Sequence, residues 1–172
     1  MLDIKIRKET KVDYDEIYNL VKKAFETAKH SDGNEQDLVN ALRKGKLYIN
    51  ELSLVAEFEE KIIGYIMFTK ILIGKYEEIT LAPLAILPEY QKMGIGKQLI
   101  LEGHERAKMM GYHYSVVLGS EKYYPKLGYI EAKKYSIIPP FKVESKNFMA
   151  IKLNDSKEKI KGIVHYAKEF GI

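Results

Sequence analysis

The stretch "LPEYQKMGIGKQLI", Leu87 to Ile100, joins the end of a β-rich run to the start of a helical pattern. Gly94 and Gly96 lie at the junction, so backbone N–H groups at the positive end of a helix are not covered by bulky side chains. Such a helix start is well suited to bind a phosphate group. The stretch therefore predicts a strand, a turn and a helix arranged around an anion.

The composition is that of a folded globular chain. Its 172 residues include 46% hydrophobic and 30% charged side chains, and this length fits one domain, residues 1–172. The formal net charge is +4, but lysine and arginine are interspersed with acidic residues rather than gathered in a block. We therefore do not expect a nucleic-acid partner, because surfaces that bind its backbone are usually denser in positive charge, whereas anionic small molecules would be attracted.

The residues that the chain lacks exclude several kinds of chemistry. Without cysteine there is no disulfide, thiolate nucleophile or cysteine-bound metal, and the histidines do not have metal-ligand spacing. No apolar run is long enough to cross a bilayer, and "MLDIKIRKET" has charges where a secretion signal needs an apolar segment. We expect a cytoplasmic protein without a metal ion or a membrane partner.

Apolar periodicity predicts a chain that contains both strands and helices. Asp13 and Glu16 form a predicted capping box before the first helix, and Gly45 and Gly111 are predicted to end the second and third. The charged "EEK" turn between two β-rich runs indicates an antiparallel hairpin. The predicted strands are 2–10, the two arms of 52–74, 77–87, 114–119 and 148–153, and the predicted helices begin near 13, 35 and 94. The tail, 159–172, is compatible with helix or strand.

Pro83 lies inside the predicted strand 77–87. Proline has no N–H to donate to a sheet, so a strand that contains it has a bulge or faces an unpaired gap at that point. We expect one of these irregularities close to the glycine turn.

The glycine turn alone does not identify the ligand, since G-x-G is common in ordinary turns. A dinucleotide-binding motif needs a third glycine in an early βαβ unit, and a Walker A loop needs Ser or Thr where this chain has Gln98. The longer string "LAPLAILPEYQKMGIGKQLI…GY…VVLGSEKYYPKLGYIEA" resembles the GNAT superfamily of N-acetyltransferases, most of all its YhbS-like branch. The resemblance extends from the first strand to "FMAIKL".

This resemblance implies an α+β GNAT fold, in which helices flank a mixed central sheet with a splay between two parallel strands. The family's acetyl-CoA loop, [Gln/Arg]-x-x-Gly-x-[Gly/Ala], falls on Gln91, Gly94 and Gly96. A side chain at Gly96 would occupy the space that the diphosphate of acetyl-CoA needs. The backbone N–H groups expected to hold this diphosphate belong to Lys92, Met93, Gly94, Ile95, Gly96 and Lys97.

The resemblance also gives the strand before the loop a binding role. In the family this strand separates from its parallel neighbour, and its unpaired backbone groups bind the pantetheine arm and the acetyl carbonyl. The matching positions are Leu84, Ala85 and Ile86, and the neighbour would be the strand that contains Val116. Pro83 fits a strand that loses its pairing here. The side chains of Leu84 and Ile86 are equally compatible with the core.

Tyr124 matches the tyrosine of the family's Tyr-x-x-x-Gly-Phe pattern, four residues before Gly128. A tyrosine with a pKa near 10 is protonated at neutral pH, so it can give a proton to the leaving thiolate of coenzyme A. The resemblance thus implies that Tyr124 is the catalytic acid. Tyr123 falls where the family usually has an apolar core residue, and we expect it to pack in the core.

Two family positions differ in this chain. The position that holds a glutamate base in some relatives is Thr80 here, so the general base of this chain is not assigned. Glu78 lies on the same strand face, and it is either a base that acts through a water molecule or a solvated charge at the strand edge. Many relatives have an asparagine that binds pantetheine before the tyrosine, whereas this chain has Ser120, which we expect to cap the turn. Among the histidines, His30 is a candidate contact of the acceptor, and His104 is expected to be exposed.

The sequence therefore predicts an enzyme that moves an acetyl group from acetyl-CoA to a primary amine by direct transfer in a ternary complex. The lack of a cysteine nucleophile agrees with this reaction. The acceptor is expected to be a small-molecule or peptide amine. The alternative is a non-catalytic module that binds CoA or acetyl-CoA, which Thr80 keeps open.

Overall fold

The computed structural model describes residues 1–29 and 31–172 of the chain. Its α-helices are α1 (Tyr14–Phe25), α2 (Glu35–Lys44) and α3 (Ile95–Met109). Its strands are β1 (Lys5–Lys8), β2 (Tyr48–Phe58), β3 (Lys61–Ile73), β4 (Tyr76–Ile86), β5 (Tyr114–Leu118), β6 (Ile130–Glu131), β7 (Ile137–Ile138), β8 (Phe148–Lys152) and β9 (Gly162–His165). Short 3₁₀ helices lie between them, of which Pro88–Tyr90 and Tyr124–Leu127 border the site described below.

The described strands form one mixed sheet. Its hydrogen-bonded order is β1-β2-β3-β4-β5-β8-β6, and β9 pairs with β3 and β7. Neighbours are antiparallel except β4 with β5 and β7 with β9. The parallel pair β4–β5 lies inside the order, and α3 is the connection between its two strands. This is the α+β architecture that the resemblance implies.

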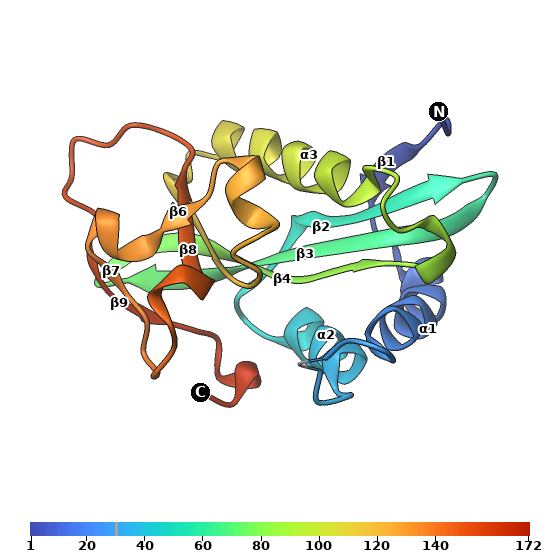
Figure 1. The fold of residues 1–172 in the computed structure, drawn as a ribbon, viewed down its shortest axis with the longest axis horizontal. Coiled ribbons are helices and arrows are strands. Elements are labelled where there is room, and N and C mark those ends of the chain that lie inside the picture. Colours follow the sequence, from blue (N-terminus) through green and yellow to red (C-terminus); the bar gives the residue numbers. More distant parts are fainter. Residues whose placement is uncertain (30) are drawn as a thin grey trace.

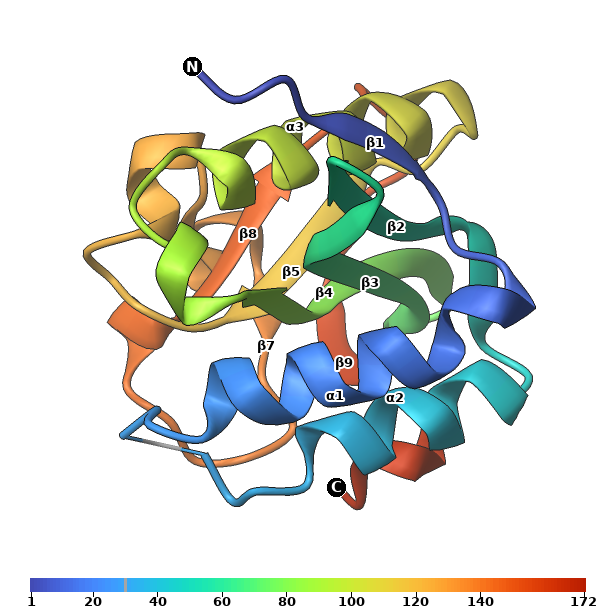
Figure 2. The same cartoon turned by 90° about the vertical axis from the view of Figure 1, so that its right-hand side faces the viewer.

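Helices cover both faces of the sheet (Figure 1). α3 lies over one face, and α1 and α2 lie side by side on the other, as Figure 2 shows. Ile17 and Leu20 of α1 are buried, as are Leu99 and Ile100 of α3. Apolar residues that recur every three or four positions give each helix one side to bury, and this packing stabilises helices of such moderate length.

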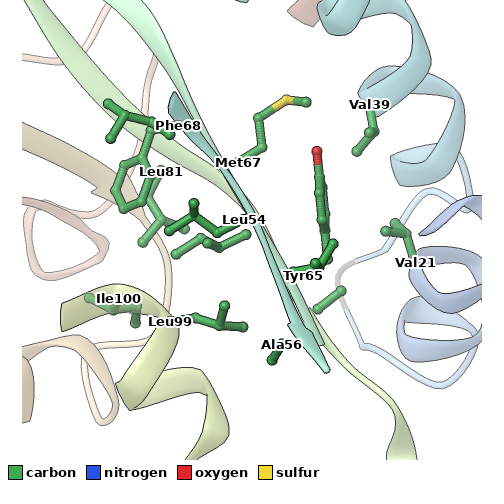
Figure 3. Packing of buried hydrophobic residues seen from close by; sticks show 14 of the residues in the cluster. Val21, Val39, Leu54, Ala56, Tyr65, Met67, Phe68, Leu81, Leu99 and Ile100 are labelled. Atoms are coloured by element: carbon green, nitrogen blue, oxygen red, sulfur yellow. The ribbon is translucent and has the colours of Figure 1, made fainter. Parts of the chain in front are cut away.

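β3 lies at the centre of this arrangement, and most of its residues are buried. Its alternate side chains reach opposite faces, so that Met67 points toward α1 and α2 while Phe68 points toward α3 (Figure 3). A strand covered on both faces reads as a continuous apolar run, which explains the pattern "IIGYIMF". Tyr65, also in β3, is fully buried, and its hydroxyl donates to Glu9 Oε1 at 2.6 Å. Arg43 pairs with the same carboxylate at 2.8 Å, so this buried charge has its partners.

The predicted β2–β3 hairpin is confirmed, and its turn consists of Glu59 and Glu60. Both residues have positive φ, 49° and 63°. Two-residue turns of this kind match the right-handed twist of the strands that they join.

The predicted capping box is wrong by three residues. The box is formed by Thr10 and Asp13, because a 3₁₀ turn, Lys11–Asp13, precedes α1. Glu16, expected to be part of the box, instead accepts the backbone N–H of Ile62 at 2.9 Å through Oε1. Glu16 therefore ties α1 to the sheet rather than to its own helix start.

The tail contains a strand, β9, where the sequence allowed either helix or strand. β9 pairs with β3 at Leu72↔His165 and with β7 at Ile137↔Gly162. These partners lie far away along the chain, so long-range pairing decides the local structure.

Candidate active site

β4 and β5 separate part of the way along their length. Among the described residues they pair only at Ile79↔Ser115 and Thr80↔Val116, although β4 continues to Ile86. Beyond Thr80, β4 is paired with β3 alone. Its backbone groups on the β5 side are therefore available to a ligand. The predicted splay between two parallel strands is confirmed.

Pro83 lies in a bulge of β4. Ile66 of β3 faces Leu84 and Phe68 faces Leu81, so β4 has one residue more than β3 over this interval. The irregularity predicted from the proline is present, and it follows directly after the point where β4 leaves β5.

The glycine turn presents backbone N–H groups at the start of α3. Lys92 and Gly94 both have left-handed backbone, with φ of 62° and 82°, a conformation that favours glycine. α3 begins at Ile95, and the N–H groups of its first turn have no acceptor inside the helix. Gln91 Nε2 donates to the carbonyl of Ile86 at 3.1 Å, which joins the loop to the end of β4.

A pocket of about 350 Å³ lies over this helix start. Most of the predicted acetyl-CoA residues line it, namely Leu84, Ile86, Gln91, Lys92, Gly94, Ile95, Gly96 and Lys97. Ala85 and Met93 lie outside the lining, since Ala85 is buried in the core and Met93 is 55% exposed. The positive helix end and two lysines suit a diphosphate, and the β4 side chains provide an apolar wall.

Tyr123 also lines this pocket, and the expectation that it packs in the core is wrong. It is 37% exposed, and its hydroxyl lies 2.7 Å from the position that a Cβ on Gly96 would take. The next atom from that position is Leu84 Cδ2, at 3.5 Å. Neighbouring side chains in a 3₁₀ turn point about 120° apart, so Tyr123 faces outward where Tyr124 faces inward.

Tyr124 is partly buried and packs against the core just after the end of β5. Its ring lies against Gly119, the residue after β5, and makes edge contacts with Tyr123 and Tyr129 at centroid distances of 5.1 and 5.6 Å. Burial raises the pKa of the Tyr124 phenol well above its ordinary value, so the hydroxyl keeps its proton at neutral pH. A protonated phenol near the open end of the splay is chemically able to donate a proton.

A buried hydrogen-bonded chain lies next to Tyr124. His104 Nε2 and the Tyr129 hydroxyl are 2.9 Å apart, and the Tyr129 hydroxyl and Ser115 Oγ are 3.0 Å apart. The prediction that His104 is exposed is wrong, because it is 6% exposed on the side of α3 that faces the sheet. Burial lowers the pKa of His104 to about 4, so its imidazole is neutral at pH 7. The chain links α3 to β5 next to the parallel pair.

Thr80 and Glu78 both hold the closed end of the splay. Thr80 Oγ1 donates to the carbonyl of Val116 at 3.0 Å. Glu78 is 1% exposed, so the expected solvated edge charge is not observed. Its Oε2 accepts the backbone N–H groups of His113 and Tyr114 at 2.7 and 2.8 Å, and its Oε1 lies 2.9 Å from His113 Nδ1. Both side chains fasten β5 to β4 rather than facing the pocket over α3.

Ser120 caps the turn before the two tyrosines, as expected. Its Oγ accepts the N–H of Lys122 at 3.1 Å, and its carbonyl accepts the N–H of Tyr124 at 3.2 Å. His30, the candidate acceptor contact, lies outside the described residues. Across residues 1–29 and 31–172, no group of side chains is placed to hold a metal ion. The described helices include none with the length and apolar character needed to cross a membrane.

Known proteins share this sequence pattern. The profile of the acetyltransferase (GNAT) family matches residues 14–129. YhbS of Escherichia coli (strain K12), an uncharacterized N-acetyltransferase, is 29% identical over 169 residues, which cover 96% of this chain and 97% of YhbS. YjhQ, another uncharacterized N-acetyltransferase of the same strain, is 40% identical over 108 residues, which cover 60% of each chain.

Solved structures share the fold along the whole chain. The crystal structure of a GNAT family N-acetyltransferase, YhbS from Escherichia coli in complex with CoA, matches with a TM-score of 0.88 and 26% identity, over 100% of this chain and 94% of that one. A GNAT family acetyltransferase from Brucella melitensis in complex with acetyl-CoA matches with a TM-score of 0.81 and 30% identity, over 99% of both chains. The overall architecture is therefore common to these proteins.

Proposed function

This chain belongs to the GNAT family of acetyltransferases, and we propose that it transfers an acetyl group from acetyl-CoA to a primary amine. The observation that carries the proposal is the pocket at the start of α3, beside the strands β4 and β5 where they part. Acetyl-CoA, when bound, supplies the acetyl group as a thioester. The acceptor in this proposal is a small-molecule or peptide amine, and the lack of cysteine favours direct transfer in a ternary complex.

The pocket residues fit the diphosphate and the apolar arm of this cosubstrate. The open N–H groups of the first turn of α3 and the helix dipole favour an anion, and Lys92 and Lys97 add positive charge at the surface. Leu84 and Ile86 give an apolar wall, and the free edge of β4 offers donors and acceptors to amide groups. The helix dipole and the two lysines thus hold the charged part of the ligand, and β4 holds its arm.

We assign Tyr124 the role of general acid. Its hydroxyl oxygen holds a proton at neutral pH, and it gives this proton to the thiolate that leaves when the amine nitrogen attacks the acetyl carbon. The attacking nitrogen loses its extra proton to solvent, and Tyr124 is reprotonated from solvent. Contacts with Gly119 and Tyr129 hold the ring in place.

Tyr124→Phe tests this role, because phenylalanine keeps the ring packing and removes the proton. We expect kcat to fall at least about 10-fold, on the order of 1.4 kcal/mol in activation free energy, with a nearly unchanged dissociation constant for acetyl-CoA. A panel of amines, screened for release of the CoA thiol, first identifies an acceptor. kcat is then measured at saturating amine, and binding is measured by calorimetry.

Tyr76→Phe is the matched control, since the Tyr76 hydroxyl bonds Glu158 at 3.1 Å and does not line the pocket. It should leave kcat unchanged. An unchanged kcat in Tyr124→Phe would mean that another group or water is the acid, and only the cofactor-binding half of the proposal would stand.

A non-catalytic module that binds CoA is the second candidate, and Thr80 favours it. This residue occupies the position of the base in some relatives, yet its hydroxyl is engaged with Val116. Such a module would bind acetyl-CoA but release no CoA thiol with any amine of the panel. If even one amine is acetylated, and this turnover depends on Tyr124, the non-catalytic module is excluded.

A further inference from the structure

Tyr123 reaches the pocket from a different part of the chain than the rest of the lining. The other lining residues belong to β4 and to residues 90–97, whereas Tyr123 directly precedes the 3₁₀ helix Tyr124–Leu127. Its position is fixed by a turn, because the N–H groups of Tyr123 and Tyr124 both donate to the carbonyl of Ser120 at 3.2 Å. The turn therefore holds the backbone that places the Tyr123 side chain at the pocket wall.

The Tyr123 hydroxyl lies directly over the first turn of α3. Its oxygen is 2.7 Å from the position that a Cβ on Gly96 would take, so the phenol and a side chain at Gly96 cannot share this space. Burial raises the pKa of Tyr123, so the hydroxyl is a protonated donor at neutral pH. Within residues 1–29 and 31–172 this hydroxyl has no hydrogen-bond partner. Its acceptor comes from solvent or from a ligand in the pocket.

We propose that Tyr123 is a cofactor-binding residue whose hydroxyl donates a hydrogen bond to the diphosphate of CoA at the start of α3. The inference rests on the proposed CoA site and adds to it a residue that the acetyl-CoA loop motif does not include. The open N–H groups of α3 and the hydroxyl then approach the same anion from two sides. The two adjacent tyrosines then have different roles. The Tyr123 hydroxyl binds the diphosphate in the pocket over α3, and the Tyr124 hydroxyl is the proton donor at the end of β5.

Tyr123→Phe removes this donor and keeps the ring. Hydrogen bonds to charged groups are among the stronger ones, so we expect the dissociation constant for CoA to rise about 10-fold. Calorimetry with ADP, which has a diphosphate but no pantetheine, should show a similar loss, and pantetheine without phosphate should show none. Tyr76→Phe, which removes a phenol hydroxyl that bonds Glu158 and does not line the pocket, is the control and should leave CoA affinity unchanged.

A double-mutant cycle with Gly96→Ala tests whether Gly96 and Tyr123 share one space. The added methyl group displaces the Tyr123 hydroxyl, so Gly96→Ala already loses the hydrogen bond. Tyr123→Phe on top of Gly96→Ala should then cost less than it does in the wild type. Fully additive losses would overturn the proposal. The melting temperatures of the ligand-free variants show whether each one is folded. If Gly96→Ala does not fold, the CoA affinity of the single variant Tyr123→Phe decides whether the proposal holds.

The outcomes separate this inference from the proposed function. If the wild type binds CoA and a folded Tyr123→Phe variant binds it equally well, Tyr123 does not contact the diphosphate and the inference is wrong. Equal losses for ADP and pantetheine would also overturn it, because the contact would then involve more than the diphosphate. A wild type that does not bind CoA would instead contradict the cofactor site itself.

Discussion

At the scale of single residues, the two glycines of the loop have different physical duties. Gly94 has φ of 82° and open space around its missing side chain, so its backbone conformation is what favours glycine. Gly96 is helical, and its missing side chain leaves room for the Tyr123 hydroxyl above it. A substitution at Gly94 therefore strains the turn, whereas a substitution at Gly96 fills the pocket.

Gly96→Glu should abolish the binding of acetyl-CoA while leaving the fold largely intact. Its side chain places bulk and negative charge in the pocket, and the nearest obstacle is the movable end of Tyr123. Acidic residues in the first turn of a helix are themselves favourable, so α3 should tolerate the change. We expect affinity to fall at least about 100-fold, roughly 2.7 kcal/mol, in calorimetry.

Gln98→Glu is the matched control for this variant. It adds the same charge to the first turns of α3 at an exposed position that does not line the pocket. Affinity should fall far less than in Gly96→Glu. Tight binding of acetyl-CoA by a folded Gly96→Glu variant would contradict the assignment of the loop.

At the scale of elements, most helices and strands follow from local patterns, and the parts that do not depend on distant partners. The two-residue strands β6 and β7 and the strand β9 form because other strands lie beside them, so periodicity in their own short segments does not predict them. The bulge near Pro83 could be predicted from the residue itself, because proline restricts pairing wherever it occurs, whereas the splay is expected only from the family resemblance.

Whether the side chains of His104 and Tyr123 are buried or exposed could not be predicted from their residue types alone. His104 follows Ile100 by four residues and precedes Ala107 by three, so helical spacing did place it on the buried side of α3. Its polarity favoured the surface, but Tyr129, a partner 25 residues away, makes burial possible. Tyr123 faces the pocket for a similar reason. The contacts of the Tyr124 ring with Tyr129 fix which side of the short 3₁₀ turn faces the core, and Tyr123 then lies on the other side.

The buried link between α3 and β5 predicts a pH dependence of stability. The pKa of His104 is lowered from 6.5 to about 4 by burial, so the unfolded chain binds a proton between these pH values and the folded chain does not. Stability from this group is therefore fully present above pH 6.5 and is lost as pH falls toward 4. The loss is at most about 3 kcal/mol. Urea unfolding at a series of pH values measures it.

His104→Gln provides the comparison, because glutamine can still bond the Tyr129 hydroxyl but does not titrate. Its stability should depend less steeply on pH between 6.5 and 4 than that of the wild type. Other groups, such as Asp13 with its pKa lowered mainly by its hydrogen bond to Arg7, contribute equally to both proteins. Identical slopes for the two proteins would show that His104 is not buried as a neutral residue.

At the scale of the whole molecule, the long central strand connects the two hydrophobic clusters. Met67 and Phe68 of β3 belong to the cluster between the sheet and the helices, and Ile71 and Ile73 belong to the cluster around β5, β8 and β9. A strand shared by both clusters couples their unfolding. We therefore propose that residues 1–172 form one domain that unfolds in a single cooperative transition.

This single transition should move upward when acetyl-CoA binds. A ligand that binds only the folded state adds RT ln(1 + [L]/Kd), about 2.7 kcal/mol at 100 times Kd. For a chain of this length that amounts to a rise in Tm of roughly 5–11 °C, and Tm should keep rising with the logarithm of concentration. Gly96→Glu should show no rise, because its pocket is filled. Equal rises in both proteins would place CoA elsewhere on the molecule, and no rise in the wild type would contradict the cofactor site.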